Sequence, residues 1–383
     1  MRYQSTRGGE ETELVDAVMR GLAADGGLFV PEELPRFAPQ DFRGNSLAEI
    51  AAELLAPFFA GSSLERELAA ICREAFDFPL PLKRVTAELE VLELFHGPTA
   101  AFKDVGARFL AAVMERALAR SADTRPLTIL VATSGDTGGA VAAAFHRRSG
   151  IRVGVLFPKG QVSPRQQHQL TCWGDNIRAF EVGGSFDDCQ ALVKAAFTDA
   201  GLRGRHRLTA ANSINIGRIL PQVAYHAAGS LWHWRQYGST AGSIIPSGNL
   251  GNGMACDWAR AMGLPVREVV LAVNANRTIP DFLATGQWAP RTSVATLASA
   301  MDVGNPSNME RLRNLLPDFA ELRSSVEAYP VDDVEIRDAA SGLSEVQSVG
   351  RDVTDRTQAE HALSSARDQA EAANRAKGRF LAM

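Results

Sequence analysis

The sequence has little of several features that would point to particular classes of protein. Its four cysteines are scattered singly among 383 residues, without a C-x-x-C pair, so we expect neither a disulfide framework nor a cysteine zinc site. The seven histidines do not cluster at metal-ligand spacing, and no bound metal is expected. No apolar run approaches the roughly 18 residues of a membrane-spanning helix, and the N-terminus shows no signal-peptide pattern. These absences predict a cytoplasmic protein that does not bind a membrane.

The chain also lacks an excess of charge of either sign. It has 40 Lys and Arg residues against 44 Asp and Glu residues, a formal net charge of −4, which gives no general electrostatic reason to bind nucleic acid. A length of 383 residues exceeds what one compact core usually holds, so two domains are expected. Any anion must therefore be bound at a local site rather than by the overall charge.

The hydrophobic pattern changes along the chain. Residues 1–80 are mainly helical in pattern, whereas from about residue 91 short apolar or β-branched runs alternate with longer amphipathic segments. Such alternation predicts parallel sheets with helices on both faces, with ligands bound where strands end. The predicted strands are residues 91–95, 127–132, 152–157, 177–182, 207–210, 243–246 and 266–274. The predicted helices are residues 46–59, 63–76, 103–120, 140–148, 164–173, 186–200, 216–236 and 253–262.

One lysine stands at the start of a predicted helix, in a segment (residues 96–104) that reads HGPTAAFKD. The apolar neighbour Phe102 can shelter Lys103, and a partly desolvated amine at a helix N-terminus has a lowered pKa. A lysine needs such a pKa to react with a carbonyl group at neutral pH. On spacing alone, a solvated lysine in the first turn of a helix is the commoner interpretation.

Three further loops enter predicted helices and offer groups that bind anions. Residues 245–253 (IPSGNLGNG) can cradle a phosphate on backbone N–H groups, and the absence of Gly-Lys-Ser/Thr excludes a Walker loop. Residues 133–139 (TSGDTGG) form a second such loop, in which Asp136 and Thr137 can alternatively just cap a helix. Residues 212–218 (NSINIGR) offer amides, a hydroxyl and an arginine for a second phosphate.

Together these segments resemble those of threonine synthases, a family of fold-type II pyridoxal-phosphate enzymes. The lysine segment is similar to the family's cofactor-lysine segment, and residues 3–8 and 21–31 are similar to its N-terminus. Residues 157–163 and 301–308 also resemble family segments, so that the resemblance covers about residues 2–338. It implies an α/β fold with two parallel-sheet domains of the tryptophan synthase β-like kind. The N-terminal region would span residues 1–80 and the catalytic region residues 81–338.

The resemblance implies a cofactor, a substrate and a set of site residues. The cofactor would be pyridoxal phosphate, and the reaction would convert O-phospho-L-homoserine and water to L-threonine and phosphate, with Lys103 as the catalytic residue. The residues implied for cofactor binding are Phe102, Lys103, Asp136, Gly248, Asn249, Leu250, Gly251 and Asn252. The residues implied for substrate binding are Ser134, Gly135, Thr137, Lys159, Asn212, Ser213, Asn215 and Arg218. An ordinary surface lysine is an equally good interpretation of Lys159.

The last part of the sequence departs from the family pattern. Residues 339–356 resemble the end of a PAS domain, and residues 357–383 resemble the helix that leads into a histidine kinase, with apolar residues at the spacing of a short coiled coil. A family stretch similar to TAHPAKF is not found in the sequence. We therefore expect a C-terminally truncated catalytic region, impaired activity and a coiled-coil-like C-terminal helix.

Two other functions remain open at this point. Another fold-type II lyase, such as a serine or threonine dehydratase, would need no second phosphate site, so residues 212–218 distinguish it. A non-catalytic scaffold would dimerise through residues 357–383, although Lys377 in the apolar seam makes a weak zipper. The sequence does not distinguish a monomer from a homodimer.

Overall fold

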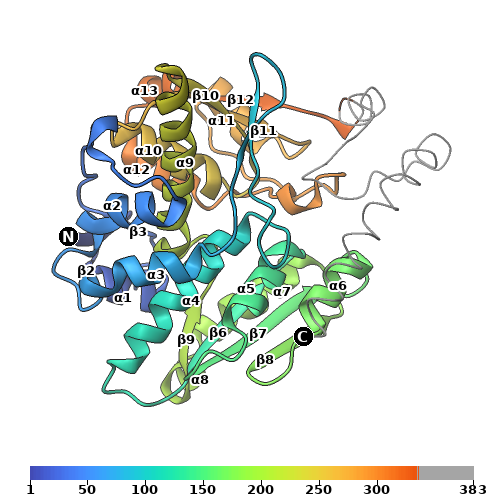
Figure 1. The fold of residues 1–383 in the computed structure, drawn as a ribbon. Helices are drawn as coiled ribbons and strands as arrows, with labels where there is room; N and C mark the ends of the chain where they lie inside the picture. Colours follow the sequence, from blue (N-terminus) through green and yellow to red (C-terminus); the bar gives the residue numbers. More distant parts are fainter. Residues whose placement is uncertain (334, 336–383) are drawn as a thin grey trace.

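The computed structural model describes residues 1–333 and 335. The predicted junction at residues 339–356 and the predicted helix at residues 357–383 lie outside the described residues. The described chain forms two lobes, each built on a parallel sheet, together with an N-terminal region that packs beside them (Figure 1). Two parallel sheets in an α/β fold confirm the predicted fold class.

The first lobe contains a four-stranded sheet in the order β8-β7-β6-β9. All its strand pairs are parallel, and β7 is buried along most of its length, as is usual for a parallel strand covered by helices. Three of its strands match the predicted bounds residue for residue. The strands are β6 (Leu127–Ala132), β7 (Ile151–Pro158), β8 (Ile177–Val182) and β9 (Arg207–Ala210).

Helices alternate with the strands of this sheet along the chain, beginning with a helix before β6, as the alternating pattern predicts. Ser163 and Ser185 begin two of them with capping boxes, in which a serine hydroxyl and a side chain three residues later satisfy free N–H groups reciprocally. The helices are α4 (Lys103–Ala119), α5 (Asp136–Phe145), α6 (Pro164–Thr171), α7 (Phe186–Thr198) and α8 (Ala200–Arg205).

The second lobe contains the three-stranded parallel sheet β10-β11-β12. One face buries Ile245 and Leu271, whereas the opposite face leaves Ile244 70% and Tyr329 66% exposed. Its strands are β10 (Ala241–Pro246), β11 (Val266–Val273) and β12 (Val326–Pro330). Its helices are α9 (Ile216–Tyr237), α10 (Gly251–Ala261), α11 (Thr278–Thr285), α12 (Met309–Leu315) and α13 (Phe319–Ser325).

The N-terminal region differs in part from its predicted helical pattern. It contains an antiparallel sheet in the order β2-β1-β3 besides its helices. The predicted strand at residues 91–95 is shorter and forms an antiparallel hairpin instead of joining a parallel sheet. The helices are α1 (Leu14–Arg20), α2 (Leu47–Phe59) and α3 (Leu68–Ala75). The strands of this region are β1 (Arg2–Ser5), β2 (Glu11–Glu13) and β3 (Phe29–Pro31). The hairpin that follows the region is formed by β4 (Leu82–Arg84) and β5 (Glu90–Leu92).

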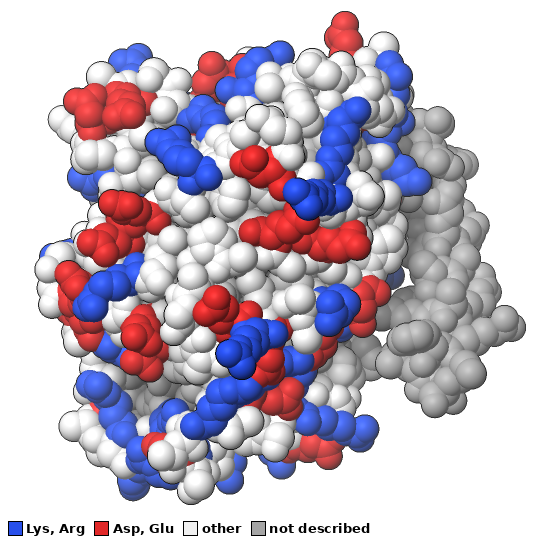
Figure 2. Space-filling model, turned by 60° about the vertical axis from the view of Figure 1, so that its left-hand side comes forward, with Lys and Arg blue, Asp and Glu red and all other residues white. Residues whose placement is uncertain are grey.

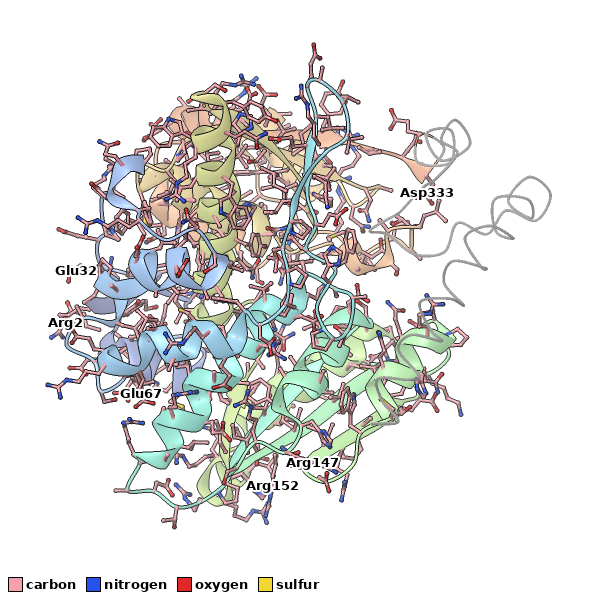
Figure 3. All side chains as sticks on the ribbon, in the orientation of Figure 1. Arg2, Glu32, Glu67, Arg147, Arg152 and Asp333 are labelled. Carbon is pink, nitrogen blue, oxygen red and sulfur yellow. The ribbon has the colours of Figure 1, made fainter. Side chains whose placement is uncertain are left out.

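On the face shown in Figure 2, positive and negative side chains are interspersed and form no extended region of one sign. Glu67, Arg147 and Arg152 lie on the outside of the fold (Figure 3). Of the helices that the structure describes, none has the length and apolar character of a membrane span. The described residues also contain no cluster of His, Cys, Asp or Glu side chains placed to hold a metal ion.

Candidate active site

Lys103 is the first residue of α4, and its side chain is only 12% exposed. Its Nζ lies 4.6 Å from the centroid of the Phe102 ring and 3.8 Å from Oδ2 of Asp136. The lysine amine is therefore partly desolvated, beside an aromatic ring and a carboxylate. Of the predicted residues, the structure brings Phe102, Lys103 and Asp136 together.

The turn before Lys103 is held by its neighbour Asp104. The buried Asp104 carboxylate accepts hydrogen bonds from the Thr99 N–H (2.8 Å) and hydroxyl (2.7 Å). Gly97 packs so closely that a Cβ there would lie 2.6 Å from Oδ2 of Asp104. Burial raises the pKa of the Asp104 carboxyl, and the Thr99 bonds oppose that rise. Asp104 thus fixes the path of the loop that presents the lysine.

The loop at residues 133–139 is shaped mainly by its own first residue. The Thr133 hydroxyl accepts hydrogen bonds from the N–H groups of Gly135 and Gly138, both at 2.9 Å. Gly135 has a φ of +142°, and a Cβ on it would lie 2.4 Å from Nε2 of Gln166. Gln166 Nε2 also donates to Oδ1 of Asp136 (3.1 Å), which fixes the carboxylate that faces Lys103.

Thr133, rather than Asp136 or Thr137, caps the helix that follows this loop. Its hydroxyl accepts from the Gly138 N–H, and Asp136 is already the first residue of α5. Ser134 and Thr137 are half-buried on the same loop, and Gly135 is buried. The loop follows β6 directly, at the carboxyl edge of the first sheet. This is the edge where open α/β sheets bind their ligands.

The loop at residues 247–252 joins β10 to α10 and has the form of an anion site. Leu250 adopts a left-handed conformation (φ +63°), and α10 begins at Gly251 with its first N–H groups free of helical partners. The Ser247 hydroxyl is buried and has no hydrogen-bond partner among the described residues. Gly248 lies against the Met301 backbone, where a Cβ would come within 2.7 Å. A strained turn, a helix N-terminus and a buried hydroxyl fit one phosphate group.

The two asparagines of this loop hold it to its surroundings. Asn249 Nδ2 donates to the Ser213 hydroxyl (2.7 Å), while its Oδ1 accepts from the Ser307 N–H (2.6 Å) and hydroxyl (2.8 Å). Asn252 Oδ1 accepts from the Tyr225 hydroxyl (2.6 Å) and lies 2.7 Å from Nε2 of His226. Because both side chains bond within the protein, the backbone of the loop is the part left to bind a ligand.

Residues 212–218 connect the two glycine-rich loops. Asn212 Nδ2 donates to the Ala132 carbonyl (3.3 Å), next to the loop at residues 133–139. The Ser213 hydroxyl accepts from Asn249 Nδ2, in the loop at residues 247–252, and from Asn308 Nδ2 (3.1 Å). Hydrogen bonds therefore link residues 212–218 to both glycine-rich loops.

Asn215 and Arg218 are placed differently from the other predicted substrate residues. Asn215 is fully buried; its amide donates to the carbonyls of Val18 and Ala210, and its Oδ1 caps α9 at Gly217. Arg218 is 3% exposed under α4, and its Nε has no partner in the described part of the chain. Burial lowers the pKa of Arg218 to about 10, so it stays charged at neutral pH. In this structure both residues hold the start of α9, and their contact with a substrate stays a prediction.

Lys159 is exposed directly after β7, at the same carboxyl edge as the first loop. Its position on that edge agrees with a contribution of positive charge, and its role stays a prediction.

Several residues that sequence reasoning did not assign complete the site. Gln166 orients Asp136, and Ser307 holds Asn249. The buried Asn308 donates to the Asn249 carbonyl (3.2 Å) as well as to Ser213, and the buried Arg311 binds the Ser213 carbonyl (2.9 Å). For Ser307 and Asn308 a signal was present, because residues 301–308 resemble a family segment and are rich in small polar residues.

Comparison with known proteins matches two family models to successive parts of the chain. A family model described as pyridoxal-phosphate dependent enzyme matches residues 78–354, and one described as threonine synthase N terminus matches residues 2–76. The threonine synthases of Serratia marcescens and Haemophilus influenzae are 42% and 43% identical to this chain. Each comparison covers 80% of this chain and 71% of the relative.

Solved structures agree with the sequence relatives. The crystal structure of threonine synthase from Escherichia coli superposes with a TM-score of 0.83 at 36% identity, over 89% of this chain and 80% of the other. The pyridoxal-phosphate-bound threonine synthase from Brucella melitensis gives a TM-score of 0.79 at 36% identity, over 87% and 78%. These comparisons show that the chain belongs to the threonine synthase family of pyridoxal-phosphate enzymes.

Proposed function

We propose that this chain converts O-phospho-L-homoserine and water to L-threonine and phosphate, with pyridoxal phosphate bound at Lys103. The observation that carries the proposal is a chain of contacts: Lys103 lies beside Asp136 of the loop at residues 133–139, Asn212 bonds to Ala132 next to that loop, and Ser213 bonds to Asn249 of residues 247–252. Residues 247–252 are suited to the cofactor phosphate, and residues 212–218 are suited to a second phosphate. A hydrogen bond from Asn249 Nδ2 to the Ser213 hydroxyl joins the two loops. A substrate that carries its own phosphate explains why the site has both.

Different residues of the chain would bind different parts of the cofactor. The Lys103 amine would hold its aldehyde carbon, and the backbone of residues 248–252 would hold its phosphate. Phe102 excludes water from one side of the amine, and Asp136 orients it through the 3.8 Å contact that Gln166 stabilises. When bound, pyridoxal phosphate supplies an electron sink for the bond electrons left by a departing proton.

Lys103 has a second task as a general base. Its Nζ would take the substrate α-proton and return it later, because this amine lies where the cofactor would be held and is largely shielded from solvent. The Asp136 carboxylate, 3.8 Å from this Nζ, would face the positive charge that Lys103 carries after proton uptake. Gln166 keeps that carboxylate in place throughout.

The remaining predicted residues would bind the substrate. Ser134, Gly135 and Thr137 would face its carboxylate. Asn212 and Ser213 would face its phosphate and stabilise the charge that develops as this group leaves. Three further residues would act on the phosphate from a greater distance. Asn215 orients the Gly217 N–H, and the cationic side chains of Arg218 and Lys159 add positive potential.

We also propose that the protein works in the cytoplasm on this small molecule. All four cysteines are free thiols, and three of them are buried. Free thiols are usual in a reducing compartment.

The proposal is tested by the products. The full chain with pyridoxal phosphate should release phosphate and form threonine from O-phospho-L-homoserine, and Lys103→Ala should lower the rate by at least about 10²–10⁴-fold, the usual contribution of a general base. A dehydratase would instead form ammonia and a 2-oxo acid from serine or threonine. That result, without phosphate release from O-phospho-L-homoserine, would contradict the proposal.

A further inference from the structure

Arg311 is a fully buried cation with neutral partners. It lies in α12 and is 0% exposed. Its Nε donates to the Phe29 carbonyl (3.1 Å), Nη1 to the Ser213 carbonyl (2.9 Å) and Asn308 Oδ1 (2.6 Å), and Nη2 to the Ile214 carbonyl (2.6 Å).

No carboxylate forms an ion pair with Arg311 within residues 1–333 and 335. Its neighbour Glu310 is bound instead by the Thr6 hydroxyl and by Arg7. Burial lowers the pKa of Arg311 to about 9, so it remains mostly protonated at neutral pH. A buried charge without a counter-charge is costly, and proteins usually pair such a charge. Within the described residues, Arg311 therefore has no carboxylate in direct contact, and Glu310 acts on it only through space.

The contacts of Arg311 control both anion loops. By holding Oδ1 of Asn308, the guanidinium turns Nδ2 of this amide toward the Asn249 carbonyl and the Ser213 hydroxyl. It also attracts the carbonyls of Ser213 and Ile214. Because a trans peptide is planar, the N–H groups that follow these carbonyls point away from Arg311. The orientation of each loop thus depends on one side chain behind them.

We propose that Arg311 is a positioning residue that sets the affinity of both loops for phosphate-bearing ligands, through its charge and its hydrogen bonds, without touching the ligand. This inference rests on the proposed function, because it assigns residues 247–252 and 212–218 to two phosphates. A dianionic phosphate monoester bound at either loop is the missing counter-charge. In the low dielectric of the interior this attraction extends beyond direct contact.

The test compares two ligands that differ only in phosphate. Pyridoxal phosphate and pyridoxal share the ring, and the internal hemiacetal of free pyridoxal is the same for every variant. The change in the ratio of their affinities between variants therefore isolates recognition of the phosphate. The variants are Arg311→Gln, which removes the charge, and Arg311→Lys, which keeps the charge and loses the planar fork. Arg313→Gln is the matched control, since Arg313 is exposed on the same helix.

We expect Arg311→Gln to reduce the affinity ratio by at least about tenfold, equivalent to the loss of one moderate charge interaction. Arg311→Lys should reduce it less, and Arg313→Gln should leave it unchanged. KM for O-phospho-L-homoserine should rise in the same order. An unchanged ratio would overturn the inference. If both affinities fell by the same factor, the role of Arg311 would be purely structural.

A second variant covers the case in which Arg311→Gln does not fold. Asn308→Asp replaces the amide whose Oδ1 lies 2.6 Å from Nη1 of Arg311 by a carboxylate, which supplies an internal counter-charge. It should fold and should reduce the phosphate-dependent ratio, and an unchanged ratio would contradict the inference.

Inorganic phosphate is titrated in parallel by thermal unfolding. It should stabilise the wild type more than Asn308→Asp, and equal stabilisation would contradict the role of Arg311. If the wild type does not bind pyridoxal phosphate through Lys103, the proposed function fails, whereas the phosphate titration still tests Arg311.

Discussion

The two glycine-rich loops are alike in sequence but are supported in different ways. The loop at residues 133–139 follows β6, an inner strand, and is shaped by the hydroxyl of its own Thr133. The loop at residues 247–252 follows β10, an edge strand, and depends on Ser213, Ser307 and Asn308 from distant parts of the chain. The first loop is therefore a local structure, whereas the second exists only when the tertiary structure has formed.

The largest expected effect contrasts the two strands that carry these loops. Ile129 on β6 is fully buried, whereas Ile244 on β10 is 70% exposed. Ile129→Ala should lower the free energy of unfolding by about 2–5 kcal/mol because it leaves a cavity. Ile244→Ala should change it by less than about 0.5 kcal/mol. Denaturant unfolding of both variants checks this, and similar losses would contradict the difference between the strands.

The second prediction concerns the close approach of the second loop to the Met301 backbone. Gly248→Ala places a Cβ 2.7 Å from Met301, where main chain must move. We expect a loss of about 1–3 kcal/mol in stability, typical of overpacking, together with weaker binding of pyridoxal phosphate. Gly139→Ala in the first loop is the control, because its Cβ would meet nothing closer than 3.5 Å. Unchanged cofactor binding in Gly248→Ala would show that the contact does not shape the loop.

The third prediction uses pH to test the support of Asn252 by His226. Burial lowers the pKa of His226 to about 4, against a usual value of 6.5. The unfolded chain therefore takes up a proton first as the pH falls, so the neutral histidine contributes stability above pH 6.5 that is lost progressively toward pH 4. Between pH 7 and pH 5 this loss should be about 2 kcal/mol.

The measurement is the free energy of unfolding at both pH values for wild type and His226→Gln. The variant should lack this part of the pH dependence, and His168→Gln, at an exposed histidine, should retain it. Parallel pH dependence of wild type and His226→Gln would rule out the assigned role.

The smallest effect is expected in the local loop. Thr133→Ala removes the acceptor for two N–H groups and should cost about 0.5–2 kcal/mol, as for a lost helix cap. Thr133→Ser keeps the hydroxyl and should cost less. Thermal unfolding measures both, and a larger loss in the serine variant would mean that the methyl group, rather than the hydroxyl, matters.

The same contrast explains what could be predicted from the sequence. The strands β6, β8 and β9 and the start of α4 at Lys103 follow from local hydrophobic patterns, and the structure confirms them. The loop at residues 133–139 was predicted because its own residues shape it. The short strands β1 to β3 were not predicted, because three or four residues carry too little periodicity for a pattern to register.

The residues missed in the site are those that act across long sequence separations. Asn308 reaches Ser213 from 95 residues away, and Arg311 reaches Phe29 from 282 residues away. No local pattern distinguishes such an arginine from one on the surface. The motif in residues 301–308 marked the segment as a family feature, and only the fold showed which of its side chains support the loop at residues 247–252.

The most direct test of the central claim is the visible absorbance of the purified chain titrated with pyridoxal phosphate, beside Lys103→Ala. The account predicts that the wild type develops the band of lysine-bound cofactor and that the variant, with the same far-ultraviolet circular dichroism, does not. An equal response of the two proteins, or no response from a folded wild type, would contradict the assignment of Lys103 as the residue on which the site is built.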